Sequence, residues 1–196
     1  MILVLLRHGQ SEWNKSNIFT GWADVELSPE GEVEAKNAGL ALKDYQFDAV
    51  FCSTLSRAQK TAEIALRPFM PPMFCSKALN ERSYGELEGK NKDEMRKIYG
   101  SEQIHIWRRS YTEKPPGGES LKDCFDRVLP YYKKEIEPRL FRGQNILVCA
   151  HGNSLRALIK YLENISDEEI TEIEIPTGAP IVYHLEREQI VEKLQL

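Results

Sequence analysis

The sequence of 196 residues contains no long apolar run. Its N-terminal run, Ile2–Leu6, has five residues, whereas a helix that crosses a membrane needs about 20. The run stops at Arg7 with no basic region before it, so we expect neither a signal peptide nor a membrane anchor. Internal repeats and low-complexity tracts are also absent, and this excludes a repeat architecture.

The chain also lacks an excess of basic charge. With 26 Lys and Arg against 30 Asp and Glu, its formal net charge is −4, so we expect neither nucleic acid nor a membrane surface as a partner. It has only four cysteines and no C-x-x-C pair. We interpret Cys52, Cys75, Cys124 and Cys149 as buried reduced thiols of a cytoplasmic protein. The apolar share of 41% is typical of one globular domain of this length.

Several catalytic motifs are missing as well. There is no H-E-x-x-H, no H-x-H and no acidic cage, so a metal site has little support. A G-x-S-x-G nucleophile elbow is absent, which disfavours a serine hydrolase. Neither a P-loop nor a G-x-G-x-x-G fingerprint is present, which disfavours nucleotide-binding folds.

What the sequence does contain is the same pattern twice, an apolar run that ends in His-Gly. Ile2–Leu6 leads into Arg7-His8-Gly9, and residues 145–150 lead into His151-Gly152. Continuous apolar runs of this length suit strands buried on both faces in a parallel sheet. Ligands bind beyond the carboxyl ends of such strands, so neighbouring strands would bring the two imidazoles into one pocket. Each histidine could instead merely cap a strand, but the matched contexts favour function.

The rest of the chain alternates between strand and helix patterns, which predicts an α/β protein with a mostly parallel sheet. We expect a polar binding loop over 10–26, because loops of this length are commonly functional. A helix should begin at Ser28-Pro29 and end near Asp44. Further strands are expected at 47–52, 73–76, 180–186 and 189–194, and further helices over 57–67, 93–99, 119–139 and 152–162.

Five residues form the predicted chemical centre: Arg7, His8, Arg57, Glu81 and His151. Two imidazoles among fixed cations suit a phosphate ester, since a neutral imidazole is a nucleophile and arginines bind phosphate oxygens. His8 would attack, His151 would stabilise the phosphoryl group when protonated, and Glu81 would protonate the leaving alkoxide. The N-terminus of the helix after His151 would favour the anion. Taken singly, Arg57 and Glu81 could equally be solvated surface charges.

The segment Leu6–Asn14 resembles the R-H-G signature of the histidine phosphatase superfamily. Within it, five further segments resemble cofactor-dependent phosphoglycerate mutases: Asn17–Leu27, Leu79–Gly85, Trp107–Arg109, His151–Leu162 and Ile175–Gly178. The resemblance covers essentially the whole chain. Its T-G-W, N-E-R-x-Y-G and W-R-R motifs are more specific than R-H-G alone.

The resemblance implies a three-layer α/β/α fold with a mostly parallel central sheet. It implies a single domain over 1–196 with a lid-like excursion at 79–118. It also implies that His8 is phosphorylated, that Glu81 is the proton donor and that His151 stabilises the transition state. The phosphate and substrate contacts that it implies are Arg7, Asn14, Thr20, Gly21, Arg57, Tyr84, Lys92, Arg108, Arg109, Gly152 and Asn153. The implied activity interconverts 3- and 2-phosphoglycerate, primed by 2,3-bisphosphoglycerate and without a metal.

The sequence departs from the long mutases in two places. Gly118 follows Arg109 closely where long mutases carry an insertion, and the tail after Leu185 is short. The P-G-G-E-S segment at 116–120 also resembles phosphatase members of the superfamily. We therefore keep a phosphatase of small phosphate monoesters as the alternative function, and either a monomer or a homodimer as the assembly. A non-catalytic phosphate-binding module is disfavoured because both histidines and the glutamate are present.

Overall fold

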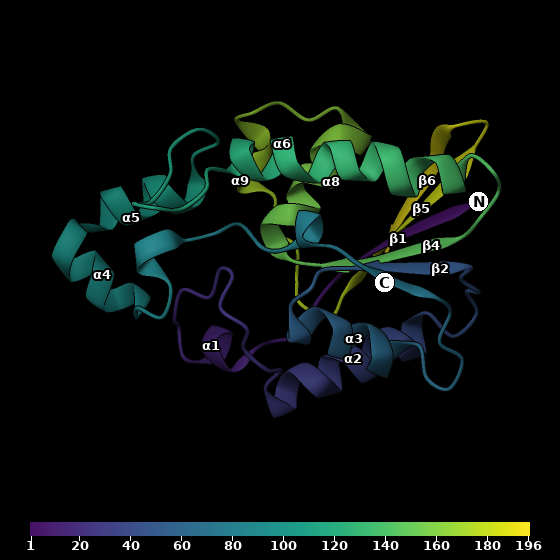
Figure 1. The fold of residues 1–196 in the computed structure, drawn as a ribbon, viewed down its shortest axis with the longest axis horizontal. Coiled ribbons are helices and arrows are strands. Elements are labelled where there is room, and N and C mark those ends of the chain that lie inside the picture. The colour runs from purple at the N-terminus through teal and green to yellow at the C-terminus, as the bar shows by residue number, and fades with distance from the viewer.

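The computed structural model describes residues 1–196 and is built on one six-stranded sheet (Figure 1). The strand order is β3-β2-β4-β1-β5-β6. The bounds are β1 Ile2–Arg7, β2 Ala49–Cys52, β3 Met73–Cys75, β4 Ile146–Ala150, β5 Pro180–Glu186 and β6 Gln189–Gln195. The pairs β1–β4, β4–β2 and β2–β3 are parallel, whereas β1–β5 and β5–β6 are antiparallel. The predicted α/β fold with a mostly parallel sheet is confirmed.

The two strands that end in His-Gly lie side by side at the centre of the sheet. Leu3–Leu6 of β1 and all of β4 are fully buried, because both faces of these central strands are covered. This burial explains the unbroken apolar runs. The parallel register pairs Arg7 with Ala150, and the N–H of His8 donates to Ala150 O at 3.0 Å. Both histidines therefore leave the sheet at the same edge.

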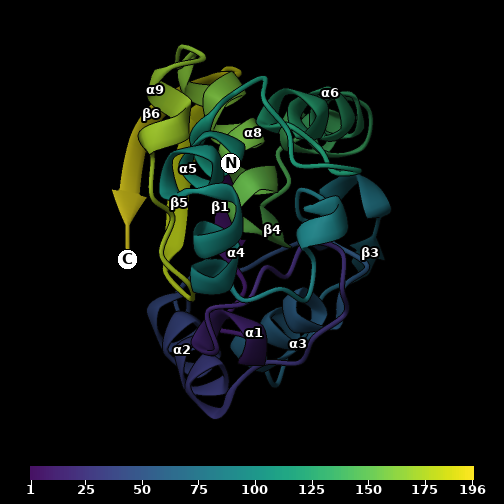
Figure 2. The ribbon, with the colours of Figure 1, turned by 90° about the vertical axis from the view of Figure 1, so that its left-hand side faces the viewer.

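Helices cover both faces of the sheet, so the fold has three layers (Figures 1 and 2). On one face lie α2 (Pro29–Ala41) and α3 (Ser56–Ala65), whose alanines pack with Val4 and Leu6. On the other lie α6 (Leu121–Tyr131) and α8 (Gly152–Glu163), whose apolar side chains pack with Leu3 and Leu5. The alternation along β1 thus divides the core into two clusters.

The helix predicted over 119–139 is not a single α-helix. After α6 the chain forms a π-helical stretch, Tyr132–Ile136, and then α7 (Glu137–Leu140). Pro138 has no N–H, so it cannot form the bond of an α-helix to the carbonyl four residues earlier. Just before it, the Glu137 N–H donates to Tyr132 O, five residues earlier, which is the bond of a π-helix.

The prediction that all four cysteines are buried thiols is wrong at one position. Cys75 is exposed on the edge strand β3, while the other three cysteines are buried.

Residues 79–118 leave the sheet and lie beyond the carboxyl ends of β1 and β4 (Figure 1). They hold a 3₁₀ turn (Gly85–Leu87), α4 (Lys92–Tyr99) and α5 (Ser101–Arg109). A small apolar cluster packs Phe19, from the loop after α1 (Glu12–Lys15), against Leu87, Met95 and Ile104. This cluster packs the excursion against the 10–26 loop.

A last short helix, α9 (Glu169–Glu172), precedes β5. None of the helices has both the length and the apolar character that crossing a membrane requires.

Candidate active site

The two histidines meet at the carboxyl edge of the sheet. The ring centroids of His8 and His151 are 4.8 Å apart, with an angle of 61° between the ring planes. Both side chains are almost completely buried. This proximity follows from the parallel pairing of β1 with β4, because each histidine is the first residue after its strand. The predicted convergence of the imidazoles is confirmed.

His8 is held in one tautomer. Its Nδ1 lies 2.6 Å from Gly9 O, and because a carbonyl oxygen only accepts, Nδ1 carries the proton and Nε2 keeps its lone pair. Burial, followed by the charges of Arg57 and Arg7, lowers the pKa of His8 well below its ordinary value. The ring is therefore neutral at pH 7, with Nε2 available as a nucleophile.

His151 is buried against Ser53, a contact that sequence analysis missed. Its Nε2 lies 2.7 Å from Ser53 Oγ, while its Nδ1 has no hydrogen-bond partner. Burial lowers the pKa of His151 well below its ordinary value, and Arg57, His8 and Arg7 lower it further. The ring is therefore neutral in this pocket, and the protonated form expected from the sequence requires an anion beside it. The position of Ser53 directly after a predicted strand was the available signal.

Two arginines place positive charge beside the histidines. Arg57 is fully buried at the start of α3 and donates to Ala23 O and Gly21 O, each at 2.8 Å. Burial lowers its pKa to about 10, so it stays charged at neutral pH. Arg7 donates to Ile175 O at 2.6 Å. Neither Nε atom has a partner, so both guanidinium groups keep a free donor for an anion.

Glu81 reaches the same place from the segment after β3. Its Oε1 accepts from Arg82 N–H at 2.8 Å and from Asn153 N–H at 3.1 Å. Asn153 lies in the first turn of α8, so the predicted anion-binding helix N-terminus holds part of this carboxylate. A Cβ added at Gly152 would lie 3.8 Å from Glu81 Oε2 and 3.7 Å from Arg7 Cζ. A side chain at Gly152 would therefore fill space between the carboxylate and the arginine.

One pocket collects nearly all of the predicted site residues. Those that line it are Arg7, His8, Asn14, Thr20, Gly21, Arg57, Glu81, Tyr84, Lys92, Arg108, Arg109 and Asn153. His151 and Gly152 are buried and do not line it. Four further lining residues were not predicted: Ile18, Phe19, Arg156 and Glu174.

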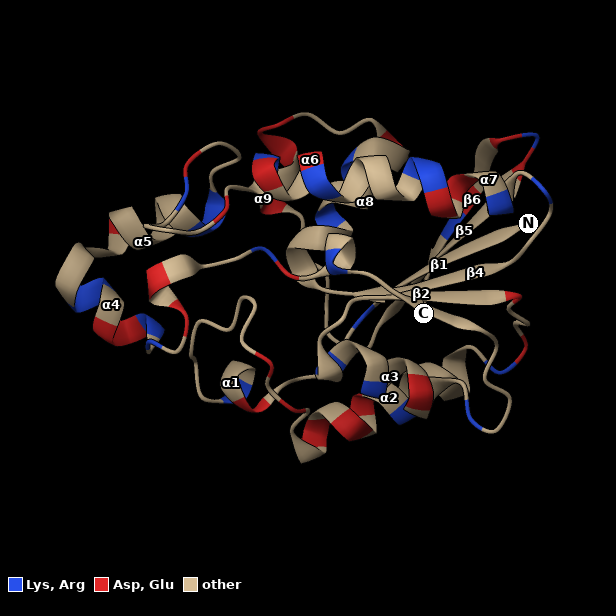
Figure 3. Ribbon diagram, in the orientation of Figure 1, with Lys and Arg blue, Asp and Glu red and all other residues tan.

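Basic residues of α4 and α5, whose ribbon positions are blue in Figure 3, also line the pocket: Lys92, Arg108 and Arg109. We call these three, with Arg156 and Glu174, the rim of the pocket. Lys92 Nζ lies 5.8 Å from the centroid of the Phe19 ring, and burial together with Arg108 lowers its pKa. Arg109 donates to Thr171 O at 3.1 Å and pairs with Glu174. The excursion therefore brings its cations to the same pocket as His8.

Arg156 and Glu174 complete this rim. Arg156 donates to Asn153 Oδ1 at 3.1 Å and to Ile173 O at 2.7 Å, and its Nη2 lies 3.6 Å from a Glu174 carboxylate oxygen. Its position three residues after Asn153, on the same helix face, was a usable signal. Glu174 carried no such signal, since an acidic residue is not expected in a basic pocket. It lies between Arg109 and Arg156 and is itself largely exposed.

Comparison with known proteins agrees with this geometry. The family model described as the histidine phosphatase superfamily (branch 1) matches residues 3–195. A 2,3-bisphosphoglycerate-dependent phosphoglycerate mutase of Cytophaga hutchinsonii is 55% identical over 93% of this chain and 86% of that protein. A phosphoglycerate mutase of Schizosaccharomyces pombe is 54% identical over 95% of this chain and 91% of that protein.

Solved structures share the fold at lower identity. Bacillus stearothermophilus YhfR has a TM-score of 0.86 at 25% identity, covering 96% of this chain and 93% of that one. The alpha-ribazole phosphatase from Shigella flexneri has a TM-score of 0.84 at 26% identity, with the same two coverages. With the R-H-G strand end, the paired histidines and a family match along almost the entire length, the chain belongs to the histidine phosphatase superfamily.

Proposed function

We propose that this protein is a 2,3-bisphosphoglycerate-dependent phosphoglycerate mutase that interconverts 3- and 2-phosphoglycerate through a phosphohistidine on His8. The observation that carries the proposal is the second set of cations, Lys92, Arg108, Arg109 and Arg156, in the same pocket as His8. Relatives that are 51–55% identical carry the mutase name. The structures named as phosphatases are only 22–26% identical.

In this reaction His8 accepts the phosphoryl group and returns it. The Nε2 lone pair attacks phosphorus and a P–N bond forms, while the bond from phosphorus to the substrate oxygen breaks. In the return step a substrate hydroxyl oxygen attacks phosphorus, and the electron pair of the P–N bond goes back to Nε2. The hydrogen bond from Nδ1 to Gly9 O keeps the ring oriented through both steps.

We assign the proton transfers to Glu81. As a carboxylic acid it gives its proton to the leaving alkoxide, and as a carboxylate it takes the proton of the attacking hydroxyl in the return step. One proton leaves and returns, so the cycle needs no other acid. Two backbone N–H groups engage Oε1, which leaves Oε2 to carry the proton.

Arg7, Arg57 and His151 stabilise the negative charge of the phosphoryl group during its transfer. The two arginine Nε atoms are buried donors without a partner, and a phosphate oxygen would satisfy them. His151 Nδ1 is also buried without a partner, and it would donate to the same phosphate once the ring is protonated. A dianionic phosphate would also raise the pKa of His151, because opposite charge favours the imidazolium. This set of donors supplies fixed positive charge, so we propose that no metal is required.

Bound 2,3-bisphosphoglycerate would supply the first phosphoryl group to His8. Its two phosphates and its carboxylate match the two groups of cations, one beside His8 and one on the rim. We propose that residues 79–118 act as a lid that excludes water while the bisphosphoglycerate intermediate reorients in the pocket. Phosphoglycerates are glycolytic intermediates, so we place the activity in the cytoplasm, with the assembly a monomer or a homodimer.

The test is a coupled assay of 3-phosphoglycerate conversion with and without 2,3-bisphosphoglycerate. A mutase should form 2-phosphoglycerate at a rate that rises with the primer. Release of inorganic phosphate as the main product, with no 2-phosphoglycerate, would overturn the proposal in favour of the phosphatase alternative.

A further inference from the structure

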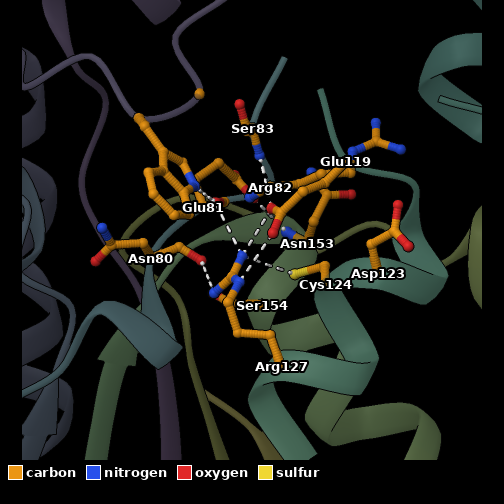
Figure 4. Close-up of polar contacts among 12 residues, drawn as sticks. Asn80, Glu81, Arg82, Ser83, Glu119, Asp123, Cys124, Arg127, Asn153 and Ser154 are labelled. Carbon is orange, nitrogen blue, oxygen red and sulfur yellow. Dashed lines mark hydrogen bonds and ion pairs between the residues drawn. The ribbon is translucent and has the colours of Figure 1, made fainter. Parts of the chain in front are cut away.

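Arg127 of α6 lies outside the pocket but is connected to the segment that carries Glu81 (Figure 4). Its guanidinium forms a bidentate ion pair with Glu119, with Nε to Oε1 at 3.0 Å and Nη2 to Oε2 at 2.9 Å. Both side chains are about four-fifths buried. An ion pair with this geometry holds the guanidinium plane in one orientation.

Apart from a contact of Nη2 with Cys124 Sγ at 3.6 Å, the remaining donors of Arg127 point at one short stretch of backbone. Nη1 donates to the carbonyl oxygens of Lys77, Ala78 and Asn80 at 3.2, 2.8 and 3.3 Å. Nη2 donates to the carbonyl oxygen of Glu81 at 3.3 Å. Four carbonyls of residues 77–81 therefore converge on one side chain. The backbone that leads into Glu81 has no regular helix or strand of its own at Asn80 and Glu81 to fix it.

The same network holds the other side of Glu81. The Glu119 carboxylate accepts from Ser83 N–H at 2.9 Å, and Glu119 N–H donates to Ser83 O at 2.9 Å. The indole N–H of Trp22 donates to Glu81 O at 2.5 Å. The Arg127 guanidinium also lies over that indole, 5.5 Å from the ring centroid. The carbonyl of Glu81 is thus fixed from the binding loop and from α6 at once.

We infer that Arg127 is a positioning residue that sets the place of the Glu81 carboxyl relative to His8. The inference rests on the proposed role of Glu81 as the proton donor. Arg127 touches no reacting group, and we assign its effect to the backbone of residues 80–83, which it contacts directly. Its charge also contributes, as the last of the causes, to the lowered pKa of His151, and Arg127→Lys keeps that charge. A misplacement of about 1 Å costs on the order of 100-fold in rate. A lysine cannot replace this arginine, because an ammonium lacks the planar fork that bonds the carboxylate and the carbonyls together.

The experiment compares two phosphoryl donors in single-turnover phosphorylation of His8, followed by intact mass. With 2,3-bisphosphoglycerate the leaving alkoxide needs the proton of Glu81. With acetyl phosphate the leaving group is acetate, which needs none. The first variant combines Arg127→Met with Glu119→Gln, which removes the ion pair without leaving the Glu119 carboxylate buried and unpaired. The second is Arg127→Lys, which keeps the positive charge. Thermal unfolding checks that each variant is folded, and Arg127→Lys carries the test if the double variant is not.

We expect each Arg127 variant to slow phosphorylation from bisphosphoglycerate by about 10- to 100-fold and to leave the acetyl phosphate rate nearly unchanged. Glu81→Gln should show the same selectivity, and adding the Arg127 change to Glu81→Gln should cost little more, because both act on one proton transfer. The matched control is Arg139→Met. Arg139 lies farther along the same helical run, and its guanidinium stacks on Phe51 and Phe74. It should leave both rates unchanged.

Equal losses with both donors, or no loss with either, would overturn the positioning role. If Glu81→Gln itself shows no selectivity between the donors, the proposed role of Glu81 fails, and the inference fails with it. Selectivity in Glu81→Gln but not in the Arg127 variants rejects the inference alone.

Discussion

At the scale of single residues, the neutral state of His8 is the feature that the chemistry needs. Gly9 O accepts a hydrogen bond from Nδ1–H, and burial together with two arginines keeps the ring neutral, with no proton on Nε2. We predict that incubation with 2,3-bisphosphoglycerate adds one phosphoryl group to the protein, measured as intact mass, and that the adduct is acid-labile and alkali-stable. His8→Ala should abolish it. An adduct that persists in His8→Ala would place the nucleophile elsewhere, with His151 the next candidate.

The lowered pKa values of the two histidines also predict how stability depends on pH. Below about pH 6.5 the unfolded chain binds protons at these residues that the folded chain does not. The free energy of unfolding should therefore fall as pH falls from about 6.5 toward the folded-state pKa values, by at most about 1.4 kcal/mol per pH unit for each histidine. Urea unfolding at a series of pH values measures this slope. A double variant, His8→Gln with His151→Gln, should lose that part of the slope, and an unchanged slope would contradict the neutral assignment.

At the scale of elements, we propose that the cations of α5 separate a mutase from a phosphatase on the same scaffold. A mutase must hold a bisphosphorylated intermediate, which requires cations beyond Arg7 and Arg57. We predict that a double Arg108→Ala, Arg109→Ala variant still forms phosphohistidine but loses mutase turnover far more than bisphosphoglycerate hydrolysis. Both rates are measured on the same preparation, by 2-phosphoglycerate formation and by phosphate release. Equal loss of both activities would mean that the lid does not separate the two reactions.

The segment between α9 and β5 adds the one rim carboxylate that pairs with the pocket arginines. Glu174 lies between Arg109 and Arg156, so an anionic substrate must compete with it. We predict that Glu174→Gln lowers KM for 3-phosphoglycerate by a factor of about two to five, the range of an exposed ion pair, and that added salt reduces the difference. Glu172→Gln, an exposed carboxylate that does not line the pocket, is the control. A higher KM in Glu174→Gln would show that the carboxylate helps to bind the substrate.

At the scale of the whole molecule, the fold assembles the positive charge from elements that are distant in sequence. Arg7 ends β1, Arg57 lies in the first turn of α3, Arg108 and Arg109 end α5, and Arg156 lies in α8. Because we propose that these side chains supply the charge stabilisation, we predict that mutase activity survives prolonged treatment with EDTA. The measurement is turnover before and after chelation, followed by addition of magnesium or manganese. Loss on chelation and recovery with a divalent metal would show that the mechanism is incomplete.

The sequence by itself determined most of the residues that meet in the pocket. Runs of apolar residues end at His8 and His151, and the strand–helix alternation around them predicts the α/β fold without knowledge of any contact. These signals are local, because periodicity and end residues depend on neighbours within a few positions. Of the sixteen residues that line the pocket, all but four were predicted as catalytic or contact residues, although Arg57 and Lys92 lie outside the motif segments.

Only the tertiary structure decided how those residues contact one another and which of them are buried. The pairing of β1 with β4 joins residues more than 140 positions apart, and burial then decides that both imidazoles are neutral. The ion pair of Arg127 with Glu119, the contact of Ser53 with His151 and the position of Glu174 between two arginines also depend on packing between separate elements. Hydrogen-bond partners and desolvation are set by which surfaces come together, and no local pattern encodes that.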